Sequence, residues 1–148
     1  VTCVAALIRT GRAMLVTSCN LANLRPVLMY DGECRLCRFI ARSLARLDRR
    51  RELAFLPLQD DAATSLLASI PANGRSDTWR LVSRDGSLTG YGAGAPALLQ
   101  AMRATRPLGR LLGRIPEPML DRAYGLIARN RRMLGRIVPD GGAPRRYP

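Results

Sequence analysis

Two cysteines stand three residues apart in the stretch YDGECRLC, which runs from residue 30 to residue 37. At this spacing Cys34 and Cys37 could hold a metal ion, lie buried as small side chains, or exchange electrons as a dithiol and a disulfide. A structural zinc site usually needs four Cys or His ligands, commonly in two close pairs. The chain has four cysteines and no histidine, and Cys3 and Cys19 do not form a second close pair. The composition therefore disfavours metal binding.

The surroundings of the pair favour redox chemistry over inert burial. A short apolar strand, Val27–Tyr30, and a turn are predicted just before a helix, so Cys34 lies near the helix N-terminus and Cys37 one turn further in. Unpaired backbone N–H groups and the helix dipole stabilise a thiolate there, and Arg35 and Arg38 add positive charge. We therefore expect Cys34 to be the more exposed and more acidic thiol, which attacks a substrate disulfide, and Cys37 to resolve the mixed disulfide.

Asp31 has two interpretations. Its carboxylate could take up the proton of Cys37 as that thiol attacks. It could also be a turn residue that binds nearby backbone N–H groups ahead of Gly32. The turn interpretation is favoured, and the two roles are compatible. Tyr30 is expected to pack at the end of the strand rather than to act in catalysis.

The elements that must position these residues alternate between strand and helix and then become helical. The hydrophobic patterns predict strands at 27–30, 53–56, 78–83 and 87–91, and helices at 36–50, 60–70, 94–105, 107–115 and 116–137. The order from Val27 to Thr105 is β-α-β-α-β-β-α, which places the chain in the α/β class.

A single domain is expected, because 148 residues with 47% apolar composition can bury one proper core. We expect it to occupy residues 25–138, ahead of a flexible Gly/Pro-rich tail at 139–148. Residues 1–24 contain VTSC, which resembles a lipoprotein cleavage box, but Arg9 and Arg12 interrupt the apolar run that an export signal needs. We therefore expect a disordered leader or a misassigned start, and a cytoplasmic protein.

Arginine dominates the charge of the chain. All 24 basic residues are Arg, against 11 acidic residues, which gives a formal net charge of +13. Such a field attracts nucleic acid, acidic lipid or acidic proteins. Nucleic acid is disfavoured as a partner, because the few aromatic residues are not interleaved with Arg and no nucleic-acid-binding motif is present. A membrane surface is also disfavoured, and the arginines at 129, 131, 132 and 136 are expected to form a solvated face.

Three segments together carry a family resemblance: YDGECRLC at 30–37, FLPLQ at 55–59 and YGLIARNR at 124–131. They resemble the DCC family of thiol–disulfide oxidoreductases, which is named for its Asp-Gly-x-Cys-x-x-Cys motif. The resemblance runs from about Val27 to the C-terminus. It implies a thioredoxin-like fold with a helical C-terminal extension, and it carries Asp31, Cys34 and Cys37 over as the motif residues.

The sequence departs from the related patterns at two places. Thioredoxins have a cis-proline facing the cysteine pair just before the third strand, where this chain has Ser76-Asp77-Thr78. The substrate clamp at Thr78 is therefore expected to be weak. Many family members also end in Cys-x-x-Pro, whereas Arg145 stands at the position of that cysteine.

The sequence thus predicts a small dithiol–disulfide oxidoreductase that needs no cofactor beyond the cysteine pair. Its expected substrate is a disulfide-containing protein or a small thiol, and the sequence does not identify the electron donor. The predicted site consists of Cys34, Cys37 and Asp31, supported by Arg35, Arg38, Gly32 and Thr78. The rival hypothesis is a basic binding module, in which the cysteine pair is incidental or binds metal and the Arg-rich helices bind acidic lipid or nucleic acid.

Overall fold

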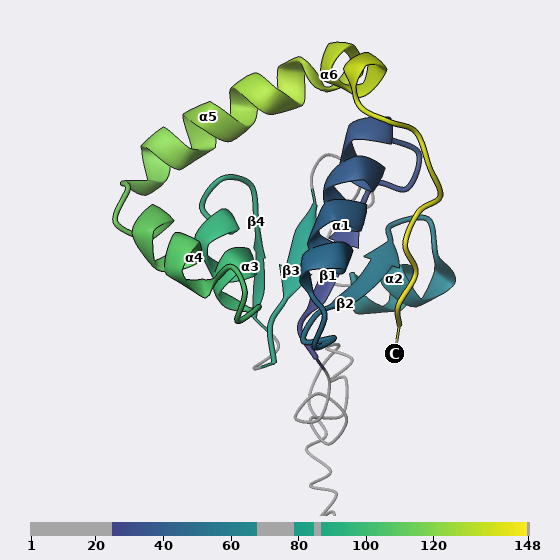
Figure 1. The fold of residues 1–148 in the computed structure, drawn as a ribbon, viewed down its shortest axis with the longest axis horizontal. Helices are drawn as coiled ribbons and strands as arrows, with labels where there is room; N and C mark the ends of the chain where they lie inside the picture. The colour runs from purple at the N-terminus through teal and green to yellow at the C-terminus, as the bar shows by residue number, and fades with distance from the viewer. Residues whose placement is uncertain (1–24, 68–78, 85–86, 148) are drawn as a thin grey trace, which may run out of the picture.

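The computed structural model describes residues 25–67, 79–84 and 87–147 (Figure 1). The leader at 1–24, Thr78 and the predicted hairpin turn at 85–86 lie outside the described residues.

The described strands form one four-stranded mixed sheet. They are β1 (Val27–Tyr30), β2 (Ala54–Pro57), β3 (Arg80–Val82) and β4 (Leu88–Gly90), in the spatial order β2-β1-β3-β4. β1 runs parallel to β2 and antiparallel to β3, and β3 runs antiparallel to β4. A parallel pair needs a crossover connection, which the helix between β1 and β2 supplies. The predicted α/β class and thioredoxin-like order are confirmed.

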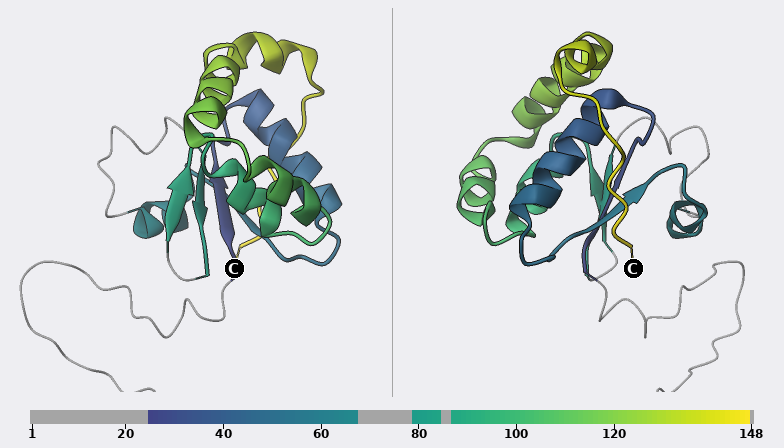
Figure 2. Two further views of the ribbon diagram at one scale, coloured as in Figure 1. Left: turned by 90° about the vertical axis from the view of Figure 1, so that its left-hand side faces the viewer. Right: turned by 45° about the vertical axis from the view of Figure 1, so that its right-hand side comes forward.

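Helices cover both faces of the sheet (Figure 2). The first three are α1 (Arg35–Leu47), α2 (Asp61–Leu66) and α3 (Ala95–Gln100). Side chains alternate along each strand, so Leu28 and Tyr30 pack with α1 and α3, while Val27 and Met29 pack with α2. Because both faces are covered, all four residues of β1 are buried, which explains why this strand is continuously apolar.

Three further helices follow the sheet: α4 (Arg106–Leu112), α5 (Glu117–Arg129) and α6 (Arg131–Ile137). In Figure 1, α5 spans the top of the molecule from α4 to α6. The single helix predicted for 116–137 is therefore wrong, because the chain breaks at Asn130. The Asn130 side-chain amide donates to the carbonyl oxygen of Leu126 at 2.8 Å, so this residue ends α5 while its own carbonyl begins α6. Asparagine side chains compete with helical backbone bonding in this way.

The C-terminal segment, for which a flexible tail was expected, contacts several elements of the fold. Residues 139–147 run back past α1 towards β2 and α2, and they bind residues far away in the sequence (Figure 1). The Tyr30 hydroxyl donates to the Pro144 carbonyl oxygen at 2.6 Å. Arg146 and Phe55 exchange backbone hydrogen bonds of 2.9 and 3.1 Å, and the Arg145 guanidinium lies 2.6 Å from the Asp60 carboxylate. The Gly/Pro composition thus prevents a helix without preventing docking.

A buried carboxylate organises the turn between α1 and β2. Asp48 is 3% exposed, and its two oxygens accept the N–H groups of Glu52 at 2.8 Å and Leu53 at 3.0 Å. Arg146 also lies 3.5 Å from this carboxylate. Arg51, between these residues, has a φ of 53°, a left-handed conformation that non-glycine residues rarely adopt. The hydrogen bonds to Asp48 stabilise this turn, which leads into β2.

Replacing Asp48 with alanine should reduce the free energy of unfolding by about 1–3 kcal/mol, because two backbone N–H groups lose their acceptors, one of them in a buried setting. Urea unfolding followed by circular dichroism would measure the loss. Asp48→Asn, which keeps one acceptor oxygen, should fall between the alanine variant and the parent protein. If Asp48→Ala is as stable as the parent, the carboxylate does not organise the turn.

Candidate functional site

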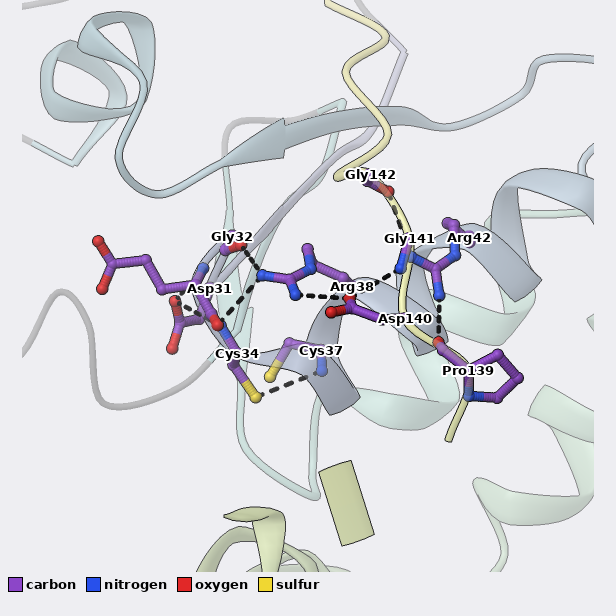
Figure 3. Close-up of polar contacts among 11 residues, drawn as sticks. Asp31, Gly32, Cys34, Cys37, Arg38, Arg42, Pro139, Asp140, Gly141 and Gly142 are labelled. Carbon is purple, nitrogen blue, oxygen red and sulfur yellow. Dashed lines mark hydrogen bonds and ion pairs between the residues drawn. The ribbon is translucent and has the colours of Figure 1, made fainter. Parts of the chain in front are cut away.

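The loop between β1 and α1 is held in shape by one carboxylate oxygen. Oδ1 of Asp31 accepts the backbone N–H groups of Glu33 at 2.9 Å and Cys34 at 3.3 Å (Figure 3). It also accepts a side-chain N–H of Gln59 at 2.9 Å. These contacts are those of a turn residue, which is the interpretation favoured from the sequence.

Gly32 is required by the close approach of the segment that follows β2. Its N–H donates to Oε1 of Gln59 at 2.9 Å, and a Cβ added to Gly32 would lie 2.9 Å from that oxygen and 3.2 Å from Cβ of Pro57. A larger residue would therefore push the loop away from β2. Gln59 was not singled out from the sequence, although it ends the FLPLQ segment. It binds both Asp31 and Gly32, so it belongs to the structure of this loop.

The two cysteines lie at the N-terminal end of α1, with Cys37 in its first turn. Cys34 is the residue before the helix, and its Sγ accepts the backbone N–H of Cys37 at 3.3 Å (Figure 3). Both thiols are free and half-buried. The sulfur of Cys34 thus occupies the position at which a helix N-terminus offers its unpaired N–H groups.

The surroundings of Cys37 disfavour its thiolate form, and its resolving role stays a prediction. Burial is the largest of the effects that raise its pKa far above the ordinary value, followed by the side-chain hydrogen bond and the negative charge of Cys34. The charge of Asp31 raises this pKa further, and Arg131 opposes the rise. These effects favour the protonated thiol of Cys37 over its thiolate.

Arg38 supports the site through the backbone of the loop. Its guanidinium donates to the carbonyl oxygens of Gly32 at 2.9 Å and Glu33 at 3.2 Å (Figure 3). The same group forms an ion pair with Asp140 at 2.7 Å, and this contact is the main reason why the pKa of Asp140 is lowered. The predicted action of the Arg38 charge on the thiolate stays a prediction, and the hydrogen bonds of this side chain go to the loop and to the C-terminal segment. Asp140 was missed because it lies 102 residues away in the sequence.

Arg35 and Thr78 are the two remaining residues of the predicted site. Arg35 is exposed on the first turn of α1, between the two cysteines. Thr78 lies outside the described residues, so its predicted role as a weak substrate clamp stays a prediction.

Two further observations concern the chemistry open to the described part of the chain. Among residues 25–67, 79–84 and 87–147, no group of three or more His, Cys, Asp or Glu side chains is placed to hold a metal ion. No helix in these same ranges combines the length and apolar character needed to cross a membrane.

Two hollows adjoin α1 in the described part of the chain. One of about 410 Å³ lies near Asp48 and Met102, and no cysteine lines it. The other, of about 260 Å³, is bordered by Cys37 and Asp31. The second hollow is therefore the one that adjoins the candidate site.

We expect Cys37 to react slowly with iodoacetamide at neutral pH, because burial keeps its thiol protonated. The comparison uses Cys34→Ser and Cys37→Ser in a background in which Cys3 and Cys19 are also serine, so that each protein carries one thiol. Alkylation rates measured from pH 6 to pH 10 should be higher for the protein that retains Cys34. Faster neutral-pH reaction of Cys37 would reverse the two roles.

Replacing Arg38 with methionine should lower the free energy of unfolding by about 1–2 kcal/mol, because the loop carbonyls and Asp140 lose a common charged donor. Lysine should restore only part of the loss, since its ammonium group cannot reproduce the planar fork of the guanidinium. Arg46→Met, at an exposed position near the end of the same helix, serves as the matched control. Urea unfolding measures stability, and equal effects of Arg38→Met and Arg46→Met would contradict this role of Arg38.

Comparison with known proteins places this geometry in a family. The chain is similar to the protein YuxK of Bacillus subtilis (strain 168), which is described as uncharacterized. The two are 29% identical over 107 residues, which cover 71% of this chain and 77% of YuxK. No solved structure matches the chain at a significant level. The model of the DCC1-like thiol-disulfide oxidoreductase family matches residues 28–137, a range that includes both cysteines and the helices that follow the sheet, and the chain belongs to that family.

Proposed function

We propose that the protein exchanges electrons with disulfide or thiol substrates through a reversible disulfide between Cys34 and Cys37. The observation that carries this proposal is the 3.3 Å contact between Sγ of Cys34 and the backbone N–H of Cys37, on the first turn of α1. Cysteines in this arrangement can close a disulfide with little movement of the backbone. Membership of a thiol–disulfide oxidoreductase family supports the same chemistry.

In the reducing direction, the Cys34 thiolate attacks one sulfur of the substrate R–S–S–R′. A bond forms between Cys34 and the sulfur of R, and R′–S⁻ leaves. Cys37 then loses its proton and attacks Sγ of Cys34, which releases R–S⁻ and leaves the Cys34–Cys37 disulfide. Two electrons pass from the dithiol to the substrate, and the oxidising direction is the reverse.

The second step depends on removing a proton from a thiol whose pKa is raised. Asp31 is the carboxylate of the loop next to Cys37, and we propose it as the group that takes up this proton. Three hydrogen bonds already reach its Oδ1, so Oδ2 would be the acceptor atom. As the proton leaves Cys37, the sulfur becomes able to attack.

The reversible cycle can be tested by counting thiols. In the background in which Cys3 and Cys19 are serine, the reduced protein should titrate with two thiols and the oxidised protein with none. Cys37→Ser should accumulate a mixed disulfide with a model disulfide, whereas Cys34→Ser should form none within the same time. Mass spectrometry identifies the adduct. A protein that keeps both thiols in the presence of excess disulfide would contradict the proposal.

A further inference from the structure

The second hollow lies between the sheet-covering helices and α5. Figure 1 shows α5 running above α3 towards α6, which lies at the top of α1. The cavity walls come from β1, α1 and α3, and its roof comes from α5 with the first residue of α6. The apolar side chains that line it include Leu28, Leu36, Ile40, Leu44, Trp79 and Leu98. The helical C-terminal extension thus closes an apolar space against the face of the sheet that carries the cysteines.

Few polar groups reach this cavity from the described residues, and Oδ1 of Asp31, one of them, already accepts three hydrogen bonds. The hydroxyl of Tyr30 donates to the carbonyl oxygen of Pro144. Asp31, Tyr124 and Arg131 also border the space. An apolar group that enters the cavity would therefore cover few polar groups of the protein. It would exchange contact with water for contact with apolar side chains.

The size of the cavity limits what it can hold. Its volume of about 260 Å³ lies just below the range of about 300–1,000 Å³ that is usual for sites enclosing a whole small ligand. The space therefore suits one apolar group, such as an aromatic ring or a short aliphatic chain, with the rest of the molecule outside.

The cavity reaches Cys37, and Cys34 lies next to it without lining the cavity. Cys37 lines it, and Sγ of Cys34 lies 3.3 Å from the backbone nitrogen of Cys37. In the mixed disulfide, the substrate sulfur would lie one S–S bond beyond Sγ of Cys34. A group attached within a few bonds of that sulfur can therefore enter the cavity while the mixed disulfide exists.

We propose that this cavity binds the apolar group of the substrate, so that the protein prefers disulfides and thiols with a ring or short aliphatic chain close to the reacting sulfur. This inference rests on the proposed exchange through Cys34 and Cys37. Two kinds of substrate have an apolar group in this position. One is a peptide with a cysteine next to an apolar residue, and the other is a low-molecular-weight apolar thiol.

Two adjacent residues of α5 give a matched pair for the test. Ile127 is 46% exposed and lines the cavity, whereas Leu126 is 56% exposed and does not line it. Ile127→Asp places a carboxylate at the roof of the cavity. Leu126→Asp makes the same chemical change on the same helix turn, away from the cavity. Both side chains are substantially exposed, and thermal melting would confirm that both variants fold.

The substrates are mixed disulfides with thionitrobenzoate as a common leaving group, whose release is followed by its absorbance. One pair compares phenylethanethiol with 2-mercaptoethanol as the other half. A second pair compares a short peptide with Phe beside its cysteine and the same peptide with Ser there. For each pair, the measured quantity is the ratio of second-order rate constants for the apolar and the polar substrate. The protein, in the background in which Cys3 and Cys19 are serine, is reduced and freed of reductant before mixing, so that only Cys34 and Cys37 release thionitrobenzoate.

The parent protein and Leu126→Asp should favour the apolar substrate by about tenfold or more, and Ile127→Asp should bring the ratio close to one. A preference confined to the peptides would identify a protein source for the apolar thiol, and one confined to the small disulfides a low-molecular-weight source. Turnover with equal rates for apolar and polar substrates would overturn the cavity proposal and leave the exchange reaction standing. A lack of turnover with every substrate would overturn both.

Discussion

The guanidinium of Arg38 joins the loop that carries Cys34 to a segment near the end of the chain. On one side it binds the carbonyl oxygens of Gly32 and Glu33, and on the other it binds the carboxylate of Asp140. The side chain of Arg38 is only 20% exposed, so these partners replace most of the water that the charge would otherwise bind. The position of the first turn of α1 relative to β1 depends on this contact. A displacement of the loop would move the Cys34 sulfur away from the N-terminus of the helix.

Hydrogen bonds from Gln59 hold the loop between β1 and α1 as well. The side chain of Gln59 accepts from Gly32 and donates to Asp31, so the segment after β2 holds the loop that follows β1. These two strands are parallel neighbours, which brings their C-terminal ends to the same end of the sheet. The cysteine pair therefore stands at the end of a parallel strand pair, and backbone N–H groups, a carboxamide and a guanidinium together determine the local conformation.

Local sequence patterns predicted much of the fold because its strands and first helices follow local rules. The apolar run of β1, the turn at Asp31-Gly32 and the helical spacing after Cys37 are all readable within some twenty residues. Asn130 gave no such signal, because neither proline nor glycine marks that break. Asp140, Arg145 and Arg146 were missed as structural residues because their partners lie 85 to 102 residues away. Contacts between residues so far apart in the sequence depend on the tertiary arrangement. Hydrophobic periodicity and turn motifs do not reveal them.

The arginines illustrate the same limit of local patterns. The composition does not distinguish among the 24 arginines. Four of them form ion pairs: Arg38, Arg103, Arg145 and Arg146. The arginines at 129, 131, 132 and 136 are exposed. Arg131 also borders the cavity beside Cys37 and lowers the pKa of that thiol against the effect of burial. The net charge therefore divides between residues that hold the fold together, residues that act on the site, and a solvated face.

The backbone exchange between Phe55 and Arg146 has a consequence for the protein in concentrated solution. Among the described strands β2 is outermost, and such a strand offers unpaired N–H and C=O groups that can template pairing with another molecule. By occupying the backbone of Phe55, the C-terminal segment takes the place that a neighbouring molecule would use. The Arg146 guanidinium also lies 5.6 Å from the centre of the Phe55 ring, so a charged group stands beside the covered strand. The segment thereby leaves fewer backbone groups of β2 open to pairing with a second molecule.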